Sequence, residues 1–297
     1  MQMVQLRDIY QQEIDENLYL GHVSLKGMFS IYSNLTRLFS CPEINWILRF
    51  DELKTEEFRE YIERILSTEF RQFTARGKSI SNDLLTELMD KMPDKATIVI
   101  DSNIRSDYSN PKALRFRSVD YKDARWLKLE DLFSIRNSYI IKLKRTNFDC
   151  SDLNEFIHYW SDCEEDMIGQ INITLKEETR IDKKEILKNF ITICNNKSGS
   201  RHAFIKARNM GNRKRVVGKF EIFENEIRFS AWDPFKEDYL YEYLVLKLVH
   251  QKRSCEEKIR KMENEYQGLR KAEKRKFQLE LKEFERKLAV LNRDFDI

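Results

Sequence analysis

The chain has 297 residues, of which 41% are hydrophobic and 12% aromatic, so it can build one large or two modest packed domains. This composition excludes a largely disordered chain. Lys and Arg together number 53 against 50 for Asp and Glu, and so small a difference indicates no polyanionic partner by itself.

The sequence contains neither a run of about 18 apolar residues nor an apolar leader, which would mark a membrane span and a secretory signal. Disulfide frameworks and zinc sites need clustered cysteines, whereas the cysteines of this chain are scattered. They are Cys41, Cys150, Cys163, Cys194 and Cys255. We therefore expect an intracellular protein, cytoplasmic or nuclear, with reduced thiols and no membrane partner.

Residues 1–43 are predicted to form an N-terminal helical cap. The clearest pattern there is the spacing of Met28, Ile31, Leu35 and Leu38, which places apolar side chains on one helix face. Such a helix would shield the end of a repetitive core from water.

Residues 44–194 contain six segments with a common strand pattern of alternating apolar positions, and all but the third are closely followed by a helix-like run. The first apolar residues of the six predicted strands are Trp46, Phe73, Ile98, Leu114, Ile141 and Ile171. Four of these helix-like runs begin at Thr55, Ser81, Ser151 and Asp182. A strand-plus-helix unit that recurs every roughly 20–30 residues predicts an α/β, leucine-rich-repeat-like solenoid, a class that usually presents a binding surface.

Residues 195–234 are predicted to form a terminal β-meander, because RHAFIKAR, RKRVVGKFEIF and NEIRFSAW each read as a β-segment. Residues 235–297 hold a single glycine, Gly268, and partly heptad-spaced apolar residues, which predict a long C-terminal helix with a partial coiled coil. One continuous helix and a helical hairpin bent near Gly268 both fit this pattern.

Motifs that carry catalysis are missing from the sequence. It contains no G-x-G-x-x-G, no P-loop, no H-E-x-x-H and no G-x-S-x-G. The four histidines lie far apart, and none is spaced from another His or Cys as a metal site requires. We therefore expect a protein that is not an enzyme and has no catalytic residue, cofactor or metal site.

The alternating polar positions of the repeat strands predict a candidate partner-binding face. Neighbouring parallel strands lie about 4.8 Å apart. If the six segments align by their common strand pattern, Arg115 lies beside Lys142 and Arg117 beside Lys144. Like charges this close are unfavourable unless they are solvated or neutralised, and an acidic protein partner would neutralise them. The alternative is that these cationic side chains point into water and bind no partner. The candidate residues are Arg49, Arg76, Arg115, Arg117, Lys142 and Lys144.

A second cluster of cations crowds the predicted hairpin at 206–219. Clustered cations can hold phosphates, but no aromatic residues interleave with these to stack on bases, and charged hairpin tips also serve solubility alone. Nucleic-acid contact is therefore the weaker interpretation. The residues are Lys206, Arg208, Arg213, Lys214, Arg215 and Lys219.

Three consecutive stretches carry a family resemblance: WLKLEDLFSIR (126–136), YIIKLKRTNF (139–148) and DLNEFIHYW (152–160). They resemble the nematode F-box-associated type 2 domain, in which a Trp-x-x-Leu-[Asp/Glu]-x-Leu-x-x-[Leu/Ile] helix, a strand and an Asp-Leu-Asn-x-Phe-x-x-x-Trp segment follow one another. The resemblance spans roughly residues 35–232. It implies a domain that selects substrates for a cullin-RING ubiquitin ligase, in proteins whose F-box docks on the Skp adaptor.

An F-box opens with a Leu-Pro-containing helix, and residues 1–41 contain no proline. No F-box is evident, so docking on the Skp adaptor is not expected from this segment. The favoured interpretation is a non-enzymatic protein–protein recognition module. The alternative is an oligomeric scaffold that self-associates through a coiled coil within residues 240–295.

Overall fold

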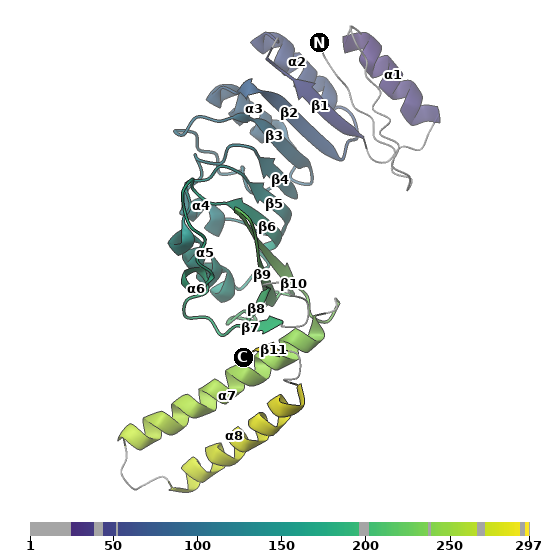
Figure 1. Ribbon diagram of the computed structural model, residues 1–297. Coiled ribbons are helices and arrows are strands. Elements are labelled where there is room, and N and C mark those ends of the chain that lie inside the picture. The colour runs from purple at the N-terminus through teal and green to yellow at the C-terminus, as the bar shows by residue number, and fades with distance from the viewer. Residues whose placement is uncertain are drawn as a thin grey trace. The chain divides into compact units, whose positions relative to one another are not determined.

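The computed structural model describes residues 25–38, 44–51, 53–195, 202–236, 239–265, 271–291 and 295–296. Its organisation is mixed α/β, as the sequence predicts. The chain divides into two compact units. The first comprises residues 1–149 and 170–179, and the second comprises residues 150–169 and 180–297. Figure 1 gives the labels of the elements.

The strands of the first unit follow one another in the sheet in the same order as in the sequence, β1-β2-β3-β4-β5-β6. Each pair from β1–β2 to β4–β5 is parallel. The bounds are β1 Asn45–Arg49, β2 Gln72–Ser79, β3 Thr97–Asn103, β4 Ser118–Tyr121, β5 Ser138–Leu143 and β6 Ile168–Thr174, which enters this unit at residue 170. Parallel neighbours require a crossover between strands, and helices supply several of these crossovers.

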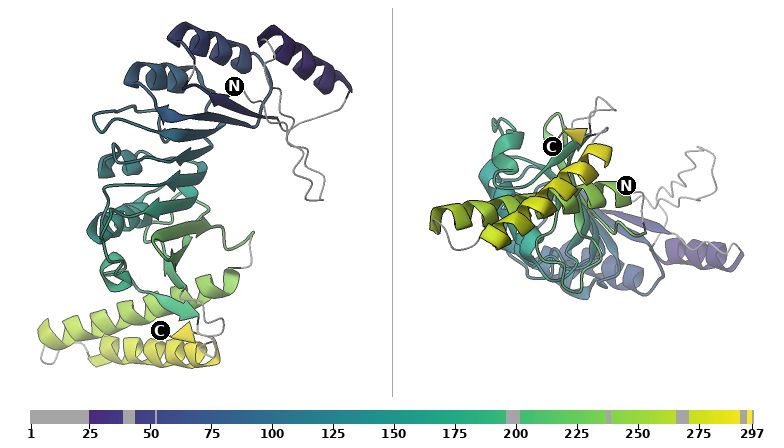
Figure 2. Two further views of the ribbon diagram at one scale, coloured as in Figure 1. Left: turned by 45° about the horizontal axis from the view of Figure 1, so that its top comes forward. Right: turned by 90° about the horizontal axis from the view of Figure 1, so that it is seen from below.

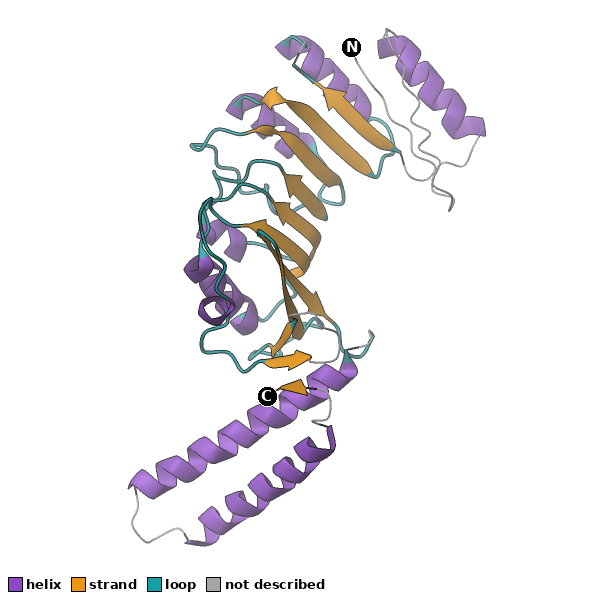
Figure 3. Cartoon of the chain, viewed as in Figure 1, coloured by secondary structure: helices purple, strands orange, loops and turns teal. Residues whose placement is uncertain are grey.

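The helices α2 (Thr55–Leu66) and α3 (Asn82–Lys91) lie on one face of these strands (Figure 3). Helix α2 begins at Thr55, as the sequence predicts, and the carboxylate of Glu57 accepts a hydrogen bond there from the backbone N–H of Lys54 at 2.9 Å. Helix α3 begins after Ser81, whose hydroxyl caps the helix. The apolar stripes of both helices are buried against the sheet.

Two further helices complete the described part of this unit. The helix α1 (Leu25–Leu38) packs on Trp46 of β1, with the rings of Phe29 and Tyr32 at 5.4 and 5.5 Å from the indole. The short α4 (Leu129–Phe133) lies between β4 and β5 in the sequence. The helix expected from the spacing of Met28 to Leu38 is therefore present, and residues 1–24 of the predicted N-terminal cap lie outside the described residues.

The predicted position of the fourth strand is wrong. Residues 111–115 form turns, in which the side chain of Asn110 accepts a hydrogen bond from the backbone N–H of Lys112 at 2.8 Å. Leu114 and Phe116 are buried from this irregular segment, so their spacing mimics a strand. The strand begins only at Ser118, and its Val119, not Leu114, is the partner of Ile98 and Ile141.

The second unit contains an antiparallel set of strands in the order β10-β9-β8-β7-β11. Their bounds are β7 Ile193–Asn195, β8 Ala203–Lys206, β9 Val217–Phe223, β10 Glu226–Trp232 and β11 Phe295–Asp296. Strands β8, β9 and β10 are the predicted meander. A glycine is required in β9, because a Cβ at Gly218 would lie 2.7 Å from the ring of Phe229.

The helix α5 (Cys150–Asp162) packs in this second unit, where Trp160 meets Phe229 of β10 edge to face at 4.8 Å. The short helix α6 (Lys183–Ile186) is capped by Asp182, whose side chain accepts a hydrogen bond from the backbone N–H of Lys184. Both helices begin where the sequence predicts them.

The C-terminal segment forms a helical hairpin of α7 (Leu240–Glu265) and α8 (Lys271–Leu291), shown side by side in Figures 1 and 2. The ammonium of Lys258 on α7 lies 5.2 Å from the ring centre of Phe277 on α8. The hairpin was one of two predicted alternatives, and Gly268 lies outside the described residues. The start of α7 is anchored by Val245, Leu246 and Val249, which are buried.

Three further observations concern only the part of the chain that the structure describes. Cys150, Cys163, Cys194 and Cys255 are free thiols there. None of its helices combines the length and the apolarity that crossing a bilayer requires. Its His, Cys, Asp and Glu side chains form no cluster that could hold a metal ion.

Candidate partner-binding face

The strands of the first unit turn alternate side chains away from the helices. In β1, Trp46 and Leu48 are buried, whereas Ile47 and Arg49 lie on the opposite face. The parallel register extends these positions into rows across the sheet. One row contains Ile47, Thr74, Val99, Asp120 and Lys142, and the next contains Arg49, Arg76 and Asp101. We call this surface the sheet face.

Ion pairs link neighbouring strands of the sheet face near their C-terminal ends. The carboxylate of Asp101 accepts a hydrogen bond from Nε of Arg76 at 2.8 Å and lies 2.9 Å from Nζ of Lys122. Asp120 lies 3.6 Å from Nζ of Lys144. The cationic side chains remain about half exposed, so they are accessible to a partner.

The like-charge neighbours predicted for this face do not form. Register places Asp120, not Arg115, beside Lys142, because β4 begins at Ser118. Arg115 belongs to the preceding turn. Arg117 also precedes the strand, and its guanidinium lies 5.7 Å from the ring centre of Tyr139. The common strand pattern predicted the wrong neighbours here, because a turn occupies the position at which the fourth strand was expected to begin.

Four of the six predicted cations, Arg49, Arg76, Lys142 and Lys144, do lie on strands of the sheet face or directly after them. Sequence reasoning missed Lys122 as well as Asp120. The signal that could have found them is the alternation of Val119 and Tyr121, which are buried on the other face. The cations named here outnumber the two carboxylates Asp101 and Asp120, so the face keeps a positive excess.

Asp101 makes the stability of this unit depend on pH. Burial by itself would raise the pKa of Asp101, but hydrogen bonds and charge attraction from Lys122 and Arg76 outweigh burial and hold it below its usual value. A lowered pKa means that the ionised carboxylate stabilises the folded state above about pH 4, and that this contribution is lost as the pH falls.

We expect Asp101→Asn to lower the free energy of unfolding by about 1 kcal/mol at pH 7, because two charge-assisted contacts are lost. At pH 3 the variant and the parent protein should differ much less. Urea denaturation at both pH values measures this. An equal loss at pH 7 and pH 3 would show that the ion pairs are not responsible.

The cations of the hairpin at 206–219 have mainly structural partners. Arg213 is only 6% exposed, and its guanidinium donates hydrogen bonds to the carbonyl oxygens of Trp160, Cys163 and Arg215. Burial lowers the pKa of the Arg213 guanidinium below its usual value. Arg213, one of the six candidate cations of this hairpin, is therefore not available as a phosphate ligand, because its donors are already used. Sequence alone did not distinguish it from its neighbour Lys214, which is exposed.

Arg208 belongs to a second set of contacts with helix α5. Its guanidinium lies 3.1 Å from Asp162 and 2.9 Å from Nδ1 of His158, and it stacks 5.3 Å from the ring centre of Phe190. Arginine can only donate, so Nδ1 of His158 must accept, and Nε2 then donates to the carbonyl oxygen of Lys188 at 3.2 Å. Arg208 thus orients the imidazole ring of His158.

The remaining hairpin cations are partly engaged. Lys219 lies 3.0 Å from Glu221, and Lys206 donates to the carbonyl oxygen of Ala207 at 3.0 Å. The carboxylate of Asp166 accepts hydrogen bonds from the backbone N–H groups of Lys214 and Arg215. Four of the six hairpin cations, all except Lys214 and Arg215, therefore use their side chains in contacts within the described chain, which leaves fewer of them for a nucleic acid.

The described surfaces therefore include a broad, charged sheet face of the kind that suits interaction with another protein. A model of the F-box associated family matches residues 109–163. The matched stretch runs through β4, α4 and β5 to the end of α5, and it contains the segments whose resemblance to that family the sequence shows. The match supports an F-box-associated, protein-interaction role for this segment. Neither the search of curated proteins nor that of solved structures found a match.

Proposed function

We propose that the chain is a non-enzymatic recognition module that binds an acidic segment of a protein partner on the sheet face. The observation that carries this proposal is the match to the F-box associated family over β4 and β5. These two strands bring Asp120, Lys122, Lys142 and Lys144 to the sheet face. The function and the best-defined charged surface therefore rest on the same stretch of sequence.

The chemistry of the sheet face favours an acidic partner. Asp101 already pairs with Arg76 and Lys122, and Asp120 pairs with Lys144. The excess positive charge attracts a carboxylate-rich segment and speeds its association. Partly exposed Val99 and Ile140 between the charged positions supply apolar contacts, which affinity needs beyond charge.

The finer role that we propose is selection of a substrate for ubiquitylation by a cullin-RING ligase, as the resemblance to nematode F-box-associated type 2 domains implies. The link to the Skp adaptor would then come from another polypeptide or from an F-box outside this sequence. Such a role places the protein in the cytoplasm or nucleus. We also propose a leucine-rich-repeat-like solenoid for the first unit, which the sequential order of its parallel strands supports.

The alternative function, an oligomeric scaffold, would use α7 and α8. Contacts such as Lys258 with Phe277 and Lys252 with Glu285 already join these helices within one chain. A hairpin whose two helices already contact each other within one chain needs a second chain less than an isolated helix does. The recognition role therefore has the stronger support.

The sheet-face proposal predicts that Lys142→Glu combined with Lys144→Glu reduces retention of the partner at least about tenfold, because two attractive charges become repulsive. The measurement is affinity purification of the full chain from its cells of origin, with quantitative mass spectrometry, followed by binding of the purified partner. Lys95→Glu, an exposed charge reversal in the turn before β3, is the matched control.

Binding to the parent protein should also weaken as salt rises. Co-purification of a Skp-type adaptor and a cullin would support the ligase role. Equal retention by the parent, the double variant and the control would contradict the sheet-face proposal. Retention that depends on the sheet face without any adaptor or cullin would keep the recognition role and contradict the ligase role.

A further inference from the structure

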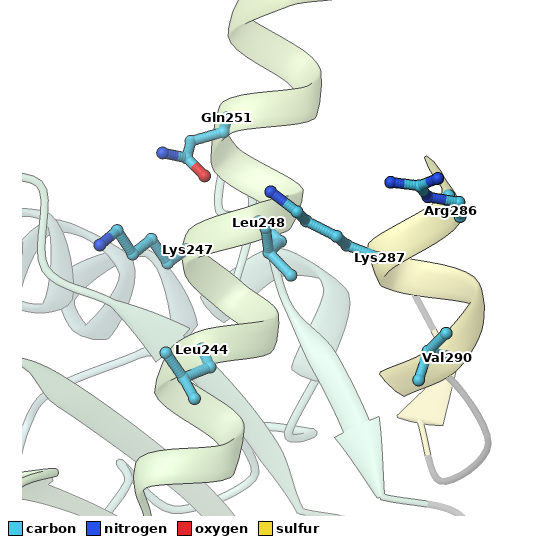
Figure 4. A pocket seen from close by; sticks show the side chains of 7 residues that line it. All are labelled: Leu244, Lys247, Leu248, Gln251, Arg286, Lys287 and Val290. Carbon is cyan, nitrogen blue, oxygen red and sulfur yellow. The ribbon is translucent and has the colours of Figure 1, made fainter. Parts of the chain in front are cut away.

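A groove lies between the helices of the hairpin, and it is distinct from the sheet face. Its volume is about 550 Å³, which is within the range of ligand-binding clefts. Figure 4 shows its lining, with Lys287 extending from α8 toward α7. The lining residues are Leu244, Lys247, Leu248 and Gln251 from α7 and Arg286, Lys287 and Val290 from α8.

The apolar part of the groove is not covered by the described part of the chain. Leu244 is 41% exposed and Val290 is 71% exposed, although both are large apolar residues. Leu248 lies one turn after Leu244 and continues the same strip along α7. Exposed apolar side chains that line one concave space mark an interaction site more than scattered ones do.

The charged part of the groove is positive. Lys247 and Arg286 make no ion pair with any described residue, and Lys287 lies 2.7 Å from Glu283. Burial, and then repulsion from Lys247, lower the pKa of Lys206 below its usual value. Lys206 and Lys247 therefore lie close enough to repel each other, and a carboxylate in the groove would offset this repulsion.

We propose that this groove binds an amphipathic helix of a partner protein, with an apolar ridge that fills the space between α7 and α8 and acidic residues that face Lys247, Arg286 and Lys287. Residues 244–251 span two turns of α7, or about 10 Å, which corresponds to apolar residues at i, i+4 and i+7 of the bound helix. The groove supplies affinity through its apolar strip and specificity through its cations.

Two other occupants fit less well. A second copy of this chain, bound symmetrically, would bring Lys247, Arg286 and Lys287 against the same cations of its partner, which is unfavourable. An anionic bilayer would meet the same charges, but a concave groove accommodates a ridge of side chains better than a flat surface.

The test uses the full chain and a fluorescent synthetic helix with leucines at i, i+4 and i+7 and flanking glutamates. We expect saturable binding by fluorescence anisotropy that weakens with salt. Leu244→Ser combined with Val290→Ser should reduce affinity about tenfold or more, because both apolar anchors are lost. Lys247→Glu combined with Arg286→Glu should reduce it by a similar factor.

Two matched controls come from the same hairpin. Leu279→Ser removes a leucine of α8 that is about as exposed as Val290, at 69% against 71%, and does not line the groove, and Lys282→Glu reverses an exposed charge there. Neither control should change affinity. All four substituted groove positions are exposed, so circular dichroism should show unchanged folding.

Equal binding by the groove variants and the controls, or equal binding of a peptide with lysines in place of the glutamates, would overturn the proposal. Two further measurements identify the other occupants. Concentration-dependent dimers in sedimentation that Leu244→Ser abolishes, without peptide binding, would assign the groove to a second copy. Binding to phosphatidylserine vesicles but not to the peptide would assign it to a membrane surface.

Discussion

Replacing Arg213 with alanine is expected to lower the free energy of unfolding by about 3 kcal/mol, because three carbonyl oxygens lose the guanidinium that donates to them. Its Nη1 donates to the carbonyl oxygens of Trp160 and Cys163 at 2.5 and 3.1 Å. Its Nε and Nη2 both donate to the carbonyl oxygen of Arg215, at 3.2 and 2.8 Å. The guanidinium also lies 4.6 Å from the ring centre of Trp160.

The alanine variant would leave those three carbonyl oxygens without a donor, since they are held together by one guanidinium fork. Arg213→Lys should be intermediate, because an ammonium keeps the charge but cannot reproduce the planar geometry. Lys214→Ala, one residue further along and exposed, should change stability by less than about 0.5 kcal/mol. Urea denaturation followed by tryptophan fluorescence measures all three variants. Similar midpoints for Arg213→Ala and Lys214→Ala would contradict the assignment of Arg213 as a structural residue.

Replacing Leu88 with alanine is expected to cost about 3 kcal/mol of unfolding free energy in the first unit. Leu88 is fully buried in α3, beside the equally buried Leu85 and Met89. Truncation removes apolar area from the core and leaves a cavity, because the neighbouring strands β2 and β3 cannot close the space.

The control lies in the same helix. Leu84 is only partly buried, so Leu84→Ala should cost about 1 kcal/mol, with the same change in helix propensity as Leu88→Ala. Thermal and urea denaturation measure both variants. Equal losses for the two variants would show that the helix does not present the face that its burial pattern indicates.

The contrast between Leu84 and Leu88 shows how far local patterns reach. Leu84 and Leu88 are four residues apart, so the helical period places both on one side of the helix that was expected to begin at Ser81, and this helix forms. The period of 3.6 residues identifies a stripe, but the stripe has a centre and a border. Only packing against the sheet determined that Leu88 lies at the centre and Leu84 nearer the border.

In the candidate sites, too, local sequence did not predict which side chains are buried. Arg213 and Lys214 are adjacent cations in one predicted hairpin, and nothing in their local sequence separates them. The first is buried under contacts with residues far away in the sequence, and the second is exposed. The long-range partner, the carbonyl group of Trp160, belongs to a helix that local reasoning could not place beside the hairpin.

The sequence by itself determined the elements whose signals are local: the capped helices that begin at Thr55 and near Ser81, the alternating strands around them, the meander and the helical C-terminal segment. Tertiary structure alone decided the start of β4 at Ser118, and with it the pairing of Asp120 and Lys144 on the sheet face. The physical reason is that caps and periodicity act within a few residues. Strand register and the burial of a charge are instead fixed by the free energy of contacts between segments distant in the chain.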